Sequence, residues 1–480
     1  MPPENEYRGP RLFRKLLLGG VLVVAAFAAA TAVAAFSEVD KVVEAFKQND
    51  RLDLGGELSE ADAGKPRTIL LLGSDIRVDA PGDKGRSDTI VLVRLDPSKK
   101  ATAMMSLPRD LKVDIPGVGT DRINAAFSYG GPKLTVKTVK QLTGLRINHV
   151  VNVDFRGFRK AVDRIGCVYV DVDRRYFNQD QSYAAIDVKP GYRRLCGVDA
   201  LSYVRFRHED NDLVRGARQQ DFLRQAKDQV GADKLFDDRD ELVKIFGKYA
   251  SSDIDSRKTV LSLLKLAVFS AGRPIQEIHF EGEIGPSYVT ASNDKLKKLT
   301  QQFLGVEDTK GPRGELGARG AKKKKKQKKS NDLELNLEDA PDAGREQALE
   351  AVAKGVKYPI YYPTKRTKGA LFAGPPEVYV IEGRDDKGSK YRSYRMVTKR
   401  GQIGEYYGLQ GTTWRDPPIL AHPSEEREIG GREYKLFYAG DRLRVISWRN
   451  RDAVYWVSNT LLQSLSKKQM IEIARSARTL

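Results

Sequence analysis

Hydrophobic runs in the first half of the chain predict buried β-strands. Residues 69–72 are apolar throughout and end at Gly73, and residues 89–95 and 101–107 follow the same pattern, the latter ending at Pro108. Continuous apolar runs of this length suit strands that are covered on both faces of an α/β sheet. Residues 167–172 alternate like a further strand, and residues 275–280 form a late one.

Helical periodicity separates the later strands. Phe155, Phe158, Val162 and Ile165 recur at helical spacing, and Gly166 ends the pattern. Residues 212–230, 259–269 and 294–304 are amphipathic at the same period. The pattern predicts an α/β domain over residues 66–305, with a central, mostly buried β-sheet flanked by helices.

The N-terminal residues predict a membrane anchor. Residues 16–36 carry no charge, and a helix of that length spans roughly 30 Å, the thickness of a hydrocarbon core. Four basic residues precede this segment, which places the N-terminus inside by the positive-inside rule: Arg8, Arg11, Arg14 and Lys15. We predict a cytoplasmic tail (1–15), a single transmembrane helix (16–36) in the cell membrane and a stalk (37–65). A cleaved signal peptide is the alternative, because Ala32-Val33-Ala34 offers a small-x-small site. Both interpretations place the remaining chain outside the cytoplasm.

The C-terminal third has a different composition. Residues 306–345 combine a lysine-rich run with an acidic stretch, which is typical of a solvated linker, although attachment to anionic lipid or wall polymer is the alternative. Residues 346–480 are rich in Tyr, Val and Gly turns and predict a second, mostly β, extracytoplasmic domain without an evident catalytic constellation.

Charge and cysteine content narrow the class of protein. The formal net charge is +19, from 83 Lys and Arg against 64 Asp and Glu, which suits nucleic acid, an anionic membrane or a polyanionic substrate. Export excludes nucleic acid as a partner. The only cysteines, Cys167 and Cys196, predict a disulfide in an exported chain, with two buried thiols as the alternative.

Charged residues gather where the predicted strands end, which is where ligands of open α/β sheets collect. Asp75 and Arg77 follow the first strand, Asp88 enters the next, and Arg109 follows the third. Two carboxylates at adjacent strand ends form an oxygen site suited to Mg²⁺. Capping of turns or helices by either aspartate is the alternative.

A further cluster follows residue 202. Arg205 and Arg207 are two apart, so their side chains point the same way in an extended segment at a strand end. Asp212, Arg215 and Gln219 lie on one face of the next helix, which also carries Arg218. Arginine forks bind phosphate oxygens in bidentate fashion. Ordinary surface ion pairing is the alternative.

These motifs together resemble the LytR-CpsA-Psr family of bacterial cell-wall enzymes over residues 66–305. The resemblance is carried, in order, by Leu70-Leu71-Leu72-Gly73-Ser74-Asp75-Ile76-Arg77, Arg86-Ser87-Asp88-Thr89, Ser106-Leu107-Pro108-Arg109-Asp110, Arg122-Ile123-Asn124-Ala125-Ala126-Phe127 and Tyr203-Val204-Arg205-Phe206-Arg207 with Asp212, Arg215, Arg218, Gln219 and Gln220.

The resemblance implies a Mg²⁺-dependent phosphotransferase that moves a glycopolymer from a polyprenyl-pyrophosphate carrier to peptidoglycan, forming a phosphodiester. It implies Asp75 and Asp88 as metal ligands, Asp212 as the base, and an apolar groove for the polyprenyl chain. Catalysis would rest on Asp212, Arg215 and Arg109. The predicted pyrophosphate-binding set is Arg109, Arg205, Arg207 and Arg215 with Gln219, to which Arg77 and Arg218 are added from the same clusters.

Two other functions use the same residues. A non-catalytic receptor for polyprenyl phosphates or wall polymer needs the arginines but no base, so the aspartates favour the enzyme. A lipid pyrophosphatase differs only in using water as the acceptor.

Overall fold

The structure is a computed structural model of the 480-residue chain. It describes residues 40–41, 43–44, 52–62, 64–75, 85–99, 101–179, 185–207, 210–230, 237–254, 256, 258–263, 266, 273–305, 335–384, 388–401 and 405–480. The predicted transmembrane helix, the lysine-rich run, Arg77 and part of the helix predicted over 259–269 lie outside these residues. Among the described helices, none has the length and apolar character needed to cross a bilayer.

A six-stranded mixed sheet forms the centre of the first half of the chain, in the order β11-β6-β1-β2-β3-β12. Its strands are β1 (Arg67–Ser74), β2 (Ser87–Leu95), β3 (Thr102–Ser106), β6 (His149–Asp154), β11 (Ala250–Ser252) and β12 (Ile275–Ile278). β1 runs parallel to β6 and β3 parallel to β12, whereas β2 is antiparallel to both its neighbours.

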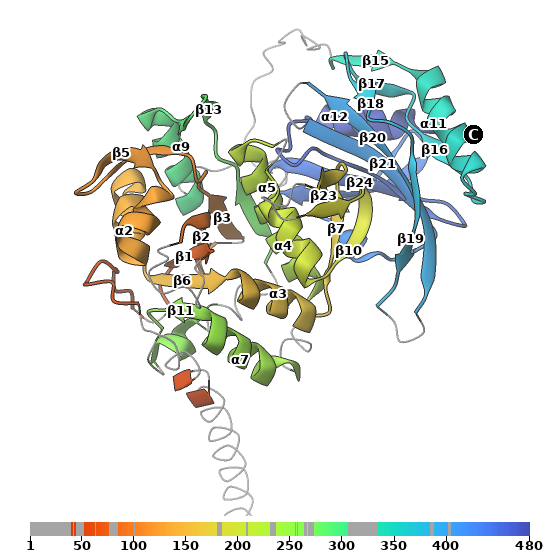
Figure 1. The fold of residues 1–480 in the computed structure, drawn as a ribbon. Helices are drawn as coiled ribbons and strands as arrows, with labels where there is room; N and C mark the ends of the chain where they lie inside the picture. The colour runs from red at the N-terminus through yellow and green to blue at the C-terminus, as the bar shows by residue number, and fades with distance from the viewer. Residues whose placement is uncertain are drawn as a thin grey trace, which may run out of the picture.

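Both faces of this sheet are covered, which explains the unbroken apolar runs. Leu70 and Leu72 belong to the larger core, under α2 (Ala125–Thr143) and α9 (Asn293–Leu304). Val91 and Met104 face the other side, where Leu223 of α5 (Asp212–Gln229) packs against them. Figure 1 shows α2 and α5 on opposite sides of the strands.

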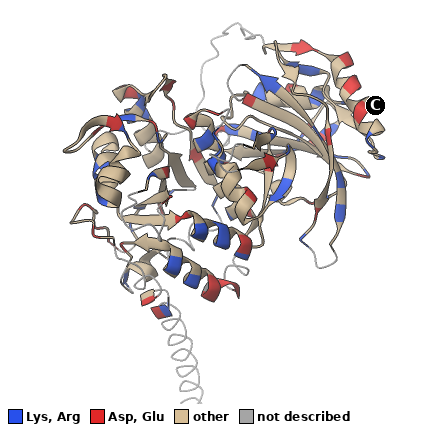
Figure 2. Ribbon diagram, viewed as in Figure 1, with Lys and Arg blue, Asp and Glu red and all other residues tan. Residues whose placement is uncertain are grey.

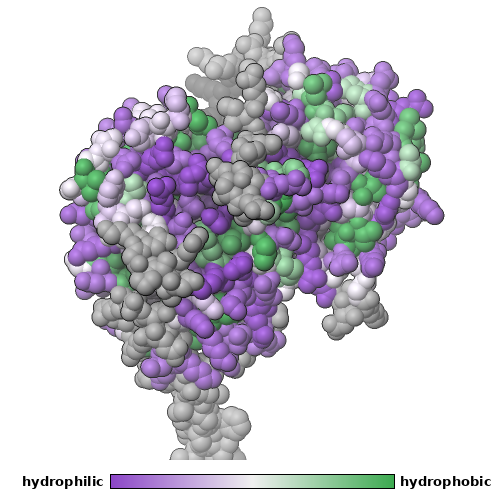
Figure 3. Space-filling model, in the orientation of Figure 1, coloured by the Kyte–Doolittle hydropathy of each residue, from purple (hydrophilic) through white to green (hydrophobic). Residues whose placement is uncertain are grey.

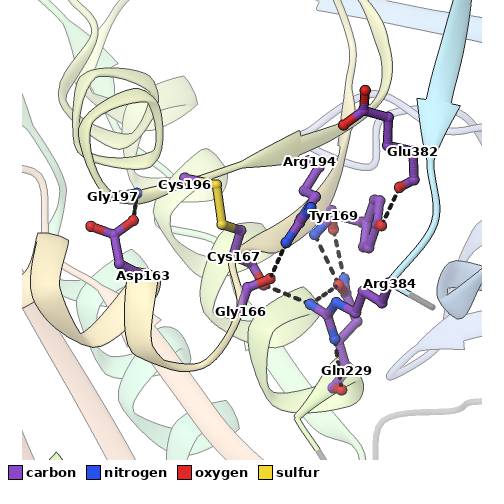
Figure 4. Close-up of a disulfide and its surroundings, with 10 residues drawn as sticks. All are labelled: Asp163, Gly166, Cys167, Tyr169, Arg194, Cys196, Gly197, Gln229, Glu382 and Arg384. Carbon is purple, nitrogen blue, oxygen red and sulfur yellow. Dashed lines mark hydrogen bonds between the residues drawn. A yellow bond between two sulfur atoms is a disulfide. The ribbon is translucent and has the colours of Figure 1, made fainter. Parts of the chain in front are cut away.

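Smaller elements complete this half of the chain. They are α3 (Phe155–Arg164), α4 (Gly197–Arg205), α7 (Arg239–Tyr249), and the antiparallel pairs β4 (Lys112–Ile115) with β5 (Gly119–Arg122), β7 (Val168–Val172) with β10 (Gly191–Leu195), β8 (Tyr176–Asn178) with β9 (Ile186–Val188), and β13 (Glu283–Ile284) with β14 (Val289–Thr290). The predicted disulfide between Cys167 and Cys196 is present, and it ties the start of β7 to the N-cap of α4 (Figure 4).

An eight-stranded antiparallel sheet dominates the C-terminal third. Its path runs β18 (Leu371–Phe372), β20 (Lys390–Arg400), β21 (Glu405–Thr412), β25 (Val454–Ser458), β24 (Arg442–Arg449), β23 (Arg432–Ala439) and β22 (Glu425–Ile429), and β19 (Glu377–Glu382) also pairs with β20. The helices α11 (Pro341–Ala353) and α12 (Lys467–Ser476) pack on one face. The short elements are β15 (Leu337–Asp339), β16 (Tyr361–Tyr362), β17 (Lys365–Thr367), the 3₁₀ helix η1 (Pro418–Leu420) and β26 (Arg478–Thr479).

The two sheets are joined by a buried interface. Tyr169 of β7 and Tyr192 of β10 pack into the same aromatic cluster as Trp456 of the second sheet. The buried Arg395 of β20 forms an ion pair with Asp171 of β7 at 2.5 Å. These contacts place α4 and α5 between the two sheets (Figure 1).

Two predicted boundaries are wrong. The stalk was expected to reach residue 65, but Leu54 is buried in the main core and the Asn148 side chain donates to the Ser59 carbonyl at 2.8 Å. The linker was expected to reach residue 345, but β15 and the start of α11 lie inside it. Charged sequence hid both segments, because each contributes only a few apolar residues to a core.

Candidate active site

Four segments bring acidic residues to one edge of the central sheet. Asp75 follows β1, Asp88 lies at the start of β2, Asp110 follows the turn after β3, and Asp212 begins α5. Ser74 pairs with Ser87 across β1 and β2. The register shifts between Gly73, which pairs with Thr89, and Ser74, so Asp88 is an extra residue in β2 at this point. Because β1 and β2 are antiparallel, the end of β1 and the start of β2, with Asp75 and Asp88, lie at the same edge of the sheet.

Asp88 is held between two arginines. It forms a direct ion pair and hydrogen bond with Arg109, and Arg205 lies 3.6 Å from its second oxygen. The Arg205 guanidinium also stacks on the Phe155 ring, 3.9 Å from the ring centroid. This aromatic face holds the guanidinium of Arg205 at the sheet edge.

A second acidic centre joins Asp110 to Asp212. The backbone N–H of Asp110 donates to the Asp212 carboxylate at 2.9 Å. Asp212 also pairs with Arg215 at 2.9 Å, and both side chains are less than 5% exposed. Arg207 donates to Asp110 at 2.9 Å and lies 3.9 Å from Asp212. Arg207 therefore bridges the two carboxylates from the solvent side.

The electrostatic environment shifts several groups of this cluster. Burial, together with the neighbouring Asp212, raises the pKa of the Asp110 carboxyl. Burial lowers the pKa of Arg215. Burial acts in the same direction on Arg109, but the carboxylates of Asp88 and Asp110 outweigh it and raise the pKa of Arg109. Several guanidinium groups are therefore gathered in the cluster, and the neighbouring carboxylates balance their charge.

The structure corrects the predicted strand end around Arg205. Residues 197–205 are the helix α4, and Phe206 leaves it in an extended conformation with its side chain buried. Phe206 anchors the chain, so Arg205 and Arg207 on either side of it still both reach the acidic residues. The sequence predicts a strand here because Arg205 and Arg207 face the site while Phe206 between them is buried. The end of a helix followed by an extended residue produces the same alternation of exposed and buried side chains.

Two predicted pyrophosphate-binding residues lie behind the cluster. The Arg218 side chain is fully buried, forms an ion pair with Asp210 and donates to the Phe206 carbonyl. The Gln219 amide donates to the Thr89 hydroxyl at 3.0 Å and to the Val204 carbonyl at 3.2 Å. These contacts position the Arg205–Arg207 turn, and neither side chain is free to meet a substrate. Arg77 lies outside the described residues.

Sequence reasoning missed the central role of Asp110 and Arg122. Arg122 of β5 lies 3.8 Å from Asp110, so three arginines surround this one carboxylate. Both residues stood inside motifs quoted for the resemblance, but no spacing argument selected them. Only the tertiary fold brings β5 to the turn after β3.

Asp75 and Asp88 carry the kind of oxygen ligand that a magnesium ion takes. The Asp75 carboxylate accepts only the backbone N–H of Arg86, at 2.5 Å, among the contacts that the described residues show, so oxygen lone pairs remain available. Magnesium is usually bound by one or two carboxylates together with substrate phosphates and water. Asp75 offers such a carboxylate at the sheet edge, whereas both oxygens of Asp88 face arginines.

The fold and the cluster define a class of protein: an α/β domain whose sheet edge gathers several arginines and carboxylates. Residues 25–303 match the LytR_cpsA_psr family, more than half of the chain. The chain belongs to this family.

Named relatives support the assignment. The chain is 31% identical over 251 residues to the polyisoprenyl-teichoic acid–peptidoglycan teichoic acid transferase TagU of Oceanobacillus iheyensis, covering 49% of this chain and 75% of the relative. It is 32% identical over 260 residues to the corresponding transferase TagT of Bacillus subtilis, covering 52% and 80%. Among solved structures, B. subtilis TagV matches with a TM-score of 0.42 at 27% identity, over 51% of this chain and 98% of that chain.

Proposed function

We propose that the chain is a phosphotransferase that transfers a glycopolymer from a polyprenyl-pyrophosphate carrier to peptidoglycan. Two relatives matched over at least three quarters of their length are named as teichoic acid transferases acting from a polyisoprenyl carrier to peptidoglycan. The observation that carries the proposal is the double arginine–carboxylate centre built on Asp88 and on Asp110 with Asp212.

The arginines are placed to bind the pyrophosphate. Arg205 and Arg207 are about one third exposed, whereas Arg215 is buried beneath them. Phosphoryl transfer depends chiefly on positioning and on neutralising oxygen charge. The exposed guanidinium groups can hold the entering phosphates, and the buried arginine keeps the floor of the site cationic.

The reaction then exchanges the phosphoanhydride bond of the carrier for a new phosphate ester bond to the acceptor. The acceptor hydroxyl oxygen attacks the phosphorus that bears the glycopolymer, a new phosphodiester bond forms, and the bond to the bridging pyrophosphate oxygen breaks. Polyprenyl monophosphate leaves. The hydroxyl proton passes to the carboxylate pair of Asp110 and Asp212, where Asp110 has an oxygen without a hydrogen-bond donor among the described residues.

The cofactor in this proposal is magnesium, held by Asp75 and Asp88. When bound, the ion would neutralise pyrophosphate oxygens. The chain's own residues supply the remaining positioning.

The proposal includes location at the outer face of the cell membrane. An anchor at residues 16–36 would keep the site beside a lipid-linked substrate, and an apolar groove would hold the polyprenyl chain. Outside the cytoplasm the phosphoanhydride of the substrate supplies the free energy for transfer.

The test uses the full chain with a radiolabelled lipid-pyrophosphoryl glycan, Mg²⁺ and peptidoglycan fragments. We expect label on the fragments together with polyprenyl monophosphate, and a loss of about 10²–10³ in rate for Arg207→Ala. Arg175→Ala is the matched control, because Arg175 is exposed and pairs with Asp187 on the β8–β9 hairpin.

The alternatives give different products. A pyrophosphatase releases glycan phosphate without fragments, and a receptor binds the lipid without turnover. Either result, or unchanged transfer by Arg207→Ala, overturns the assignment.

A further inference from the structure

A basic face outside the arginine–carboxylate cluster lies along α3 and α7. The two helices pack against each other in opposite directions, since Gly157 of α3 lies against Tyr249 at the end of α7 and Arg164 pairs with Asp238 before its start. Each helix carries basic residues at a four-residue spacing, which places them in one row on a helix surface. We define the basic face as Arg156, Lys160, Lys244, Lys248 and Tyr249. Figure 2 shows Lys and Arg in blue along both helices.

Three cations of this face surround one tyrosine ring. The charged groups of Arg156, Lys160 and Lys248 lie 6.0, 5.9 and 5.6 Å from the Tyr249 ring centroid. Within the described part of the chain, no carboxylate is within ion-pair distance of Lys160 or Lys248, whereas Arg156 is 3.8 Å from Asp154 and Lys244 is 3.5 Å from Glu241. The two lysines that lack a carboxylate neighbour among these residues, Lys160 and Lys248, favour an external anion.

The entry of the chain places this face near the proposed membrane. Val43 is buried with Ile254 and Val260, and Lys41 lies 3.5 Å from Asp240 of α7. The predicted anchor ends at residue 36, and four extended residues span at most roughly 14 Å. Residues 40–41 and 43–44 and the helices α3 and α7 lie at the same end of the molecule (Figure 1), where the described surface is largely hydrophilic (Figure 3).

We infer that the basic face docks on anionic phospholipid headgroups of the membrane that holds the anchor. Basic side chains around an amphipathic tyrosine suit the headgroup layer of a bilayer. The inference rests on the proposed function, because it requires the anchor. Docking would also orient the active site. Phe155, the first residue of α3, lies against the Arg205 guanidinium, so the docked helix would hold the active-site edge close to the lipid phosphates.

The test measures lysine reactivity in the full chain. The protein is reconstituted into nanodiscs of phosphatidylcholine alone or of phosphatidylcholine with phosphatidylglycerol, and exposed lysines are acetylated and quantified by mass spectrometry. We expect acetylation of Lys160 and Lys248 to fall about fivefold in the anionic discs, the factor that one basic residue near such a surface contributes. Lys297 and Lys298 of α9 are exposed internal controls and should not change.

A charge-reversal pair adds a functional readout. Lys160→Glu with Lys248→Glu should raise the KM for the lipid substrate in anionic discs while leaving kcat unchanged, and Lys297→Glu with Lys298→Glu should change neither. The acetylation result does not depend on activity, so failure of the proposed reaction would not obscure it. Equal acetylation in both discs, or a chain that does not float with anionic vesicles, overturns the inference. Stronger protection by soluble polyphosphate in neutral discs would assign the face to an acidic polymer and overturn it as well.

Discussion

At the level of single residues, the charges of the candidate site are balanced pair by pair. Asp88 faces two guanidinium groups and Asp110 faces three. A buried charge without a partner costs several kcal/mol, so these pairs constrain which residues can change. Arg218 shows the same constraint away from the surface, because the Asp210 side chain, its one carboxylate partner among the described residues, is itself fully buried.

Replacing Arg218 should damage the fold before it damages chemistry. Arg218→Met leaves Asp210 with Arg174 alone and removes the donor to the Phe206 carbonyl. We expect a loss of about 3–5 kcal/mol in the free energy of unfolding, measured by urea denaturation. Arg122→Ala, at a side chain that is 43% exposed, is the control and should lose less than about 1 kcal/mol. Equal losses would contradict the bracing role.

We expect the free energy of unfolding to fall in acid because His279 is buried. Burial, aided by Arg442, lowers the pKa of His279 from 6.5 to about 4. The unfolded chain therefore protonates this residue first, and the stability it contributes is present above pH 6.5 and lost as the pH falls toward 4. That loss is about 3 kcal/mol. Asp173 opposes it, because burial raises its pKa to about 6.

Variants separate the contribution of His279 from that of Asp173. His279→Asn should remove the acid-side loss relative to wild type when unfolding is followed across this pH range. His422→Asn, at an exposed position, should reproduce the wild-type profile. Parallel profiles for wild type and His279→Asn would contradict the assignment.

At the level of elements, the disulfide holds the N-terminus of α4, the helix that leads to Arg205 and Arg207. Cys196 caps α4, the helix that ends at Arg205, and Gly197 donates to the Asp163 carboxylate at 2.7 Å (Figure 4). Cys167 joins the same point to the start of β7, the strand whose Tyr169 and Asp171 contact the second sheet.

Removing this link should loosen α4. Cys167→Ala with Cys196→Ala opens a loop closed over a sequence separation of 29 residues, which should cost about 3–4 kcal/mol in the free energy of unfolding. Thermal unfolding measured with and without reductant checks this expectation, since only the wild type should respond to reduction. An unchanged wild-type transition under reduction would contradict it.

The elements also show how far the sequence could lead. The strands β1, β2 and β3 follow from unbroken apolar runs, and the helices α3 and α9 follow from apolar residues at helical spacing. The helix α5 shows the same period, but most of its buried residues are polar, Arg215, Arg218 and Gln219 among them. The helix α4 was mistaken for a strand end, since its nine residues are too few to display a period. The meeting of Asp88 and Asp212 at Arg109 is predictable from strand ends, whereas the position of Arg122 is not, because its approach to Asp110 depends on tertiary packing.

At the level of the whole molecule, the second sheet is built against the first. Arg395 reaches Asp171 and donates to the Ser458 hydroxyl, and Gln463 donates to Glu277 at 3.1 Å. Glu277 also pairs with Arg224 of α5, so the helix that carries Asp212 and Arg215 is held at its far end by this interface.

This coupling should be visible in unfolding. We expect one cooperative transition in urea for the wild type, and a loss of about 3–5 kcal/mol for Arg395→Met, which strands the Asp171 carboxylate. Adding Asp171→Leu should recover part of the loss, because no buried charge then lacks a partner. Two separated transitions in the wild type, or no recovery in the double variant, would contradict the coupling.

The carboxylates that occupy the arginines at rest also bear on turnover. A diphosphate ester entering the cluster must take guanidinium groups away from Asp88 and Asp110, so binding is an exchange of partners in which the arginines are never bare. The departing monoester has fewer phosphate oxygens that can bind the arginines. As it dissociates, Asp88 and Asp110 form their ion pairs with the arginines again. The resting ion pairs thus give the site a built-in means of expelling its product.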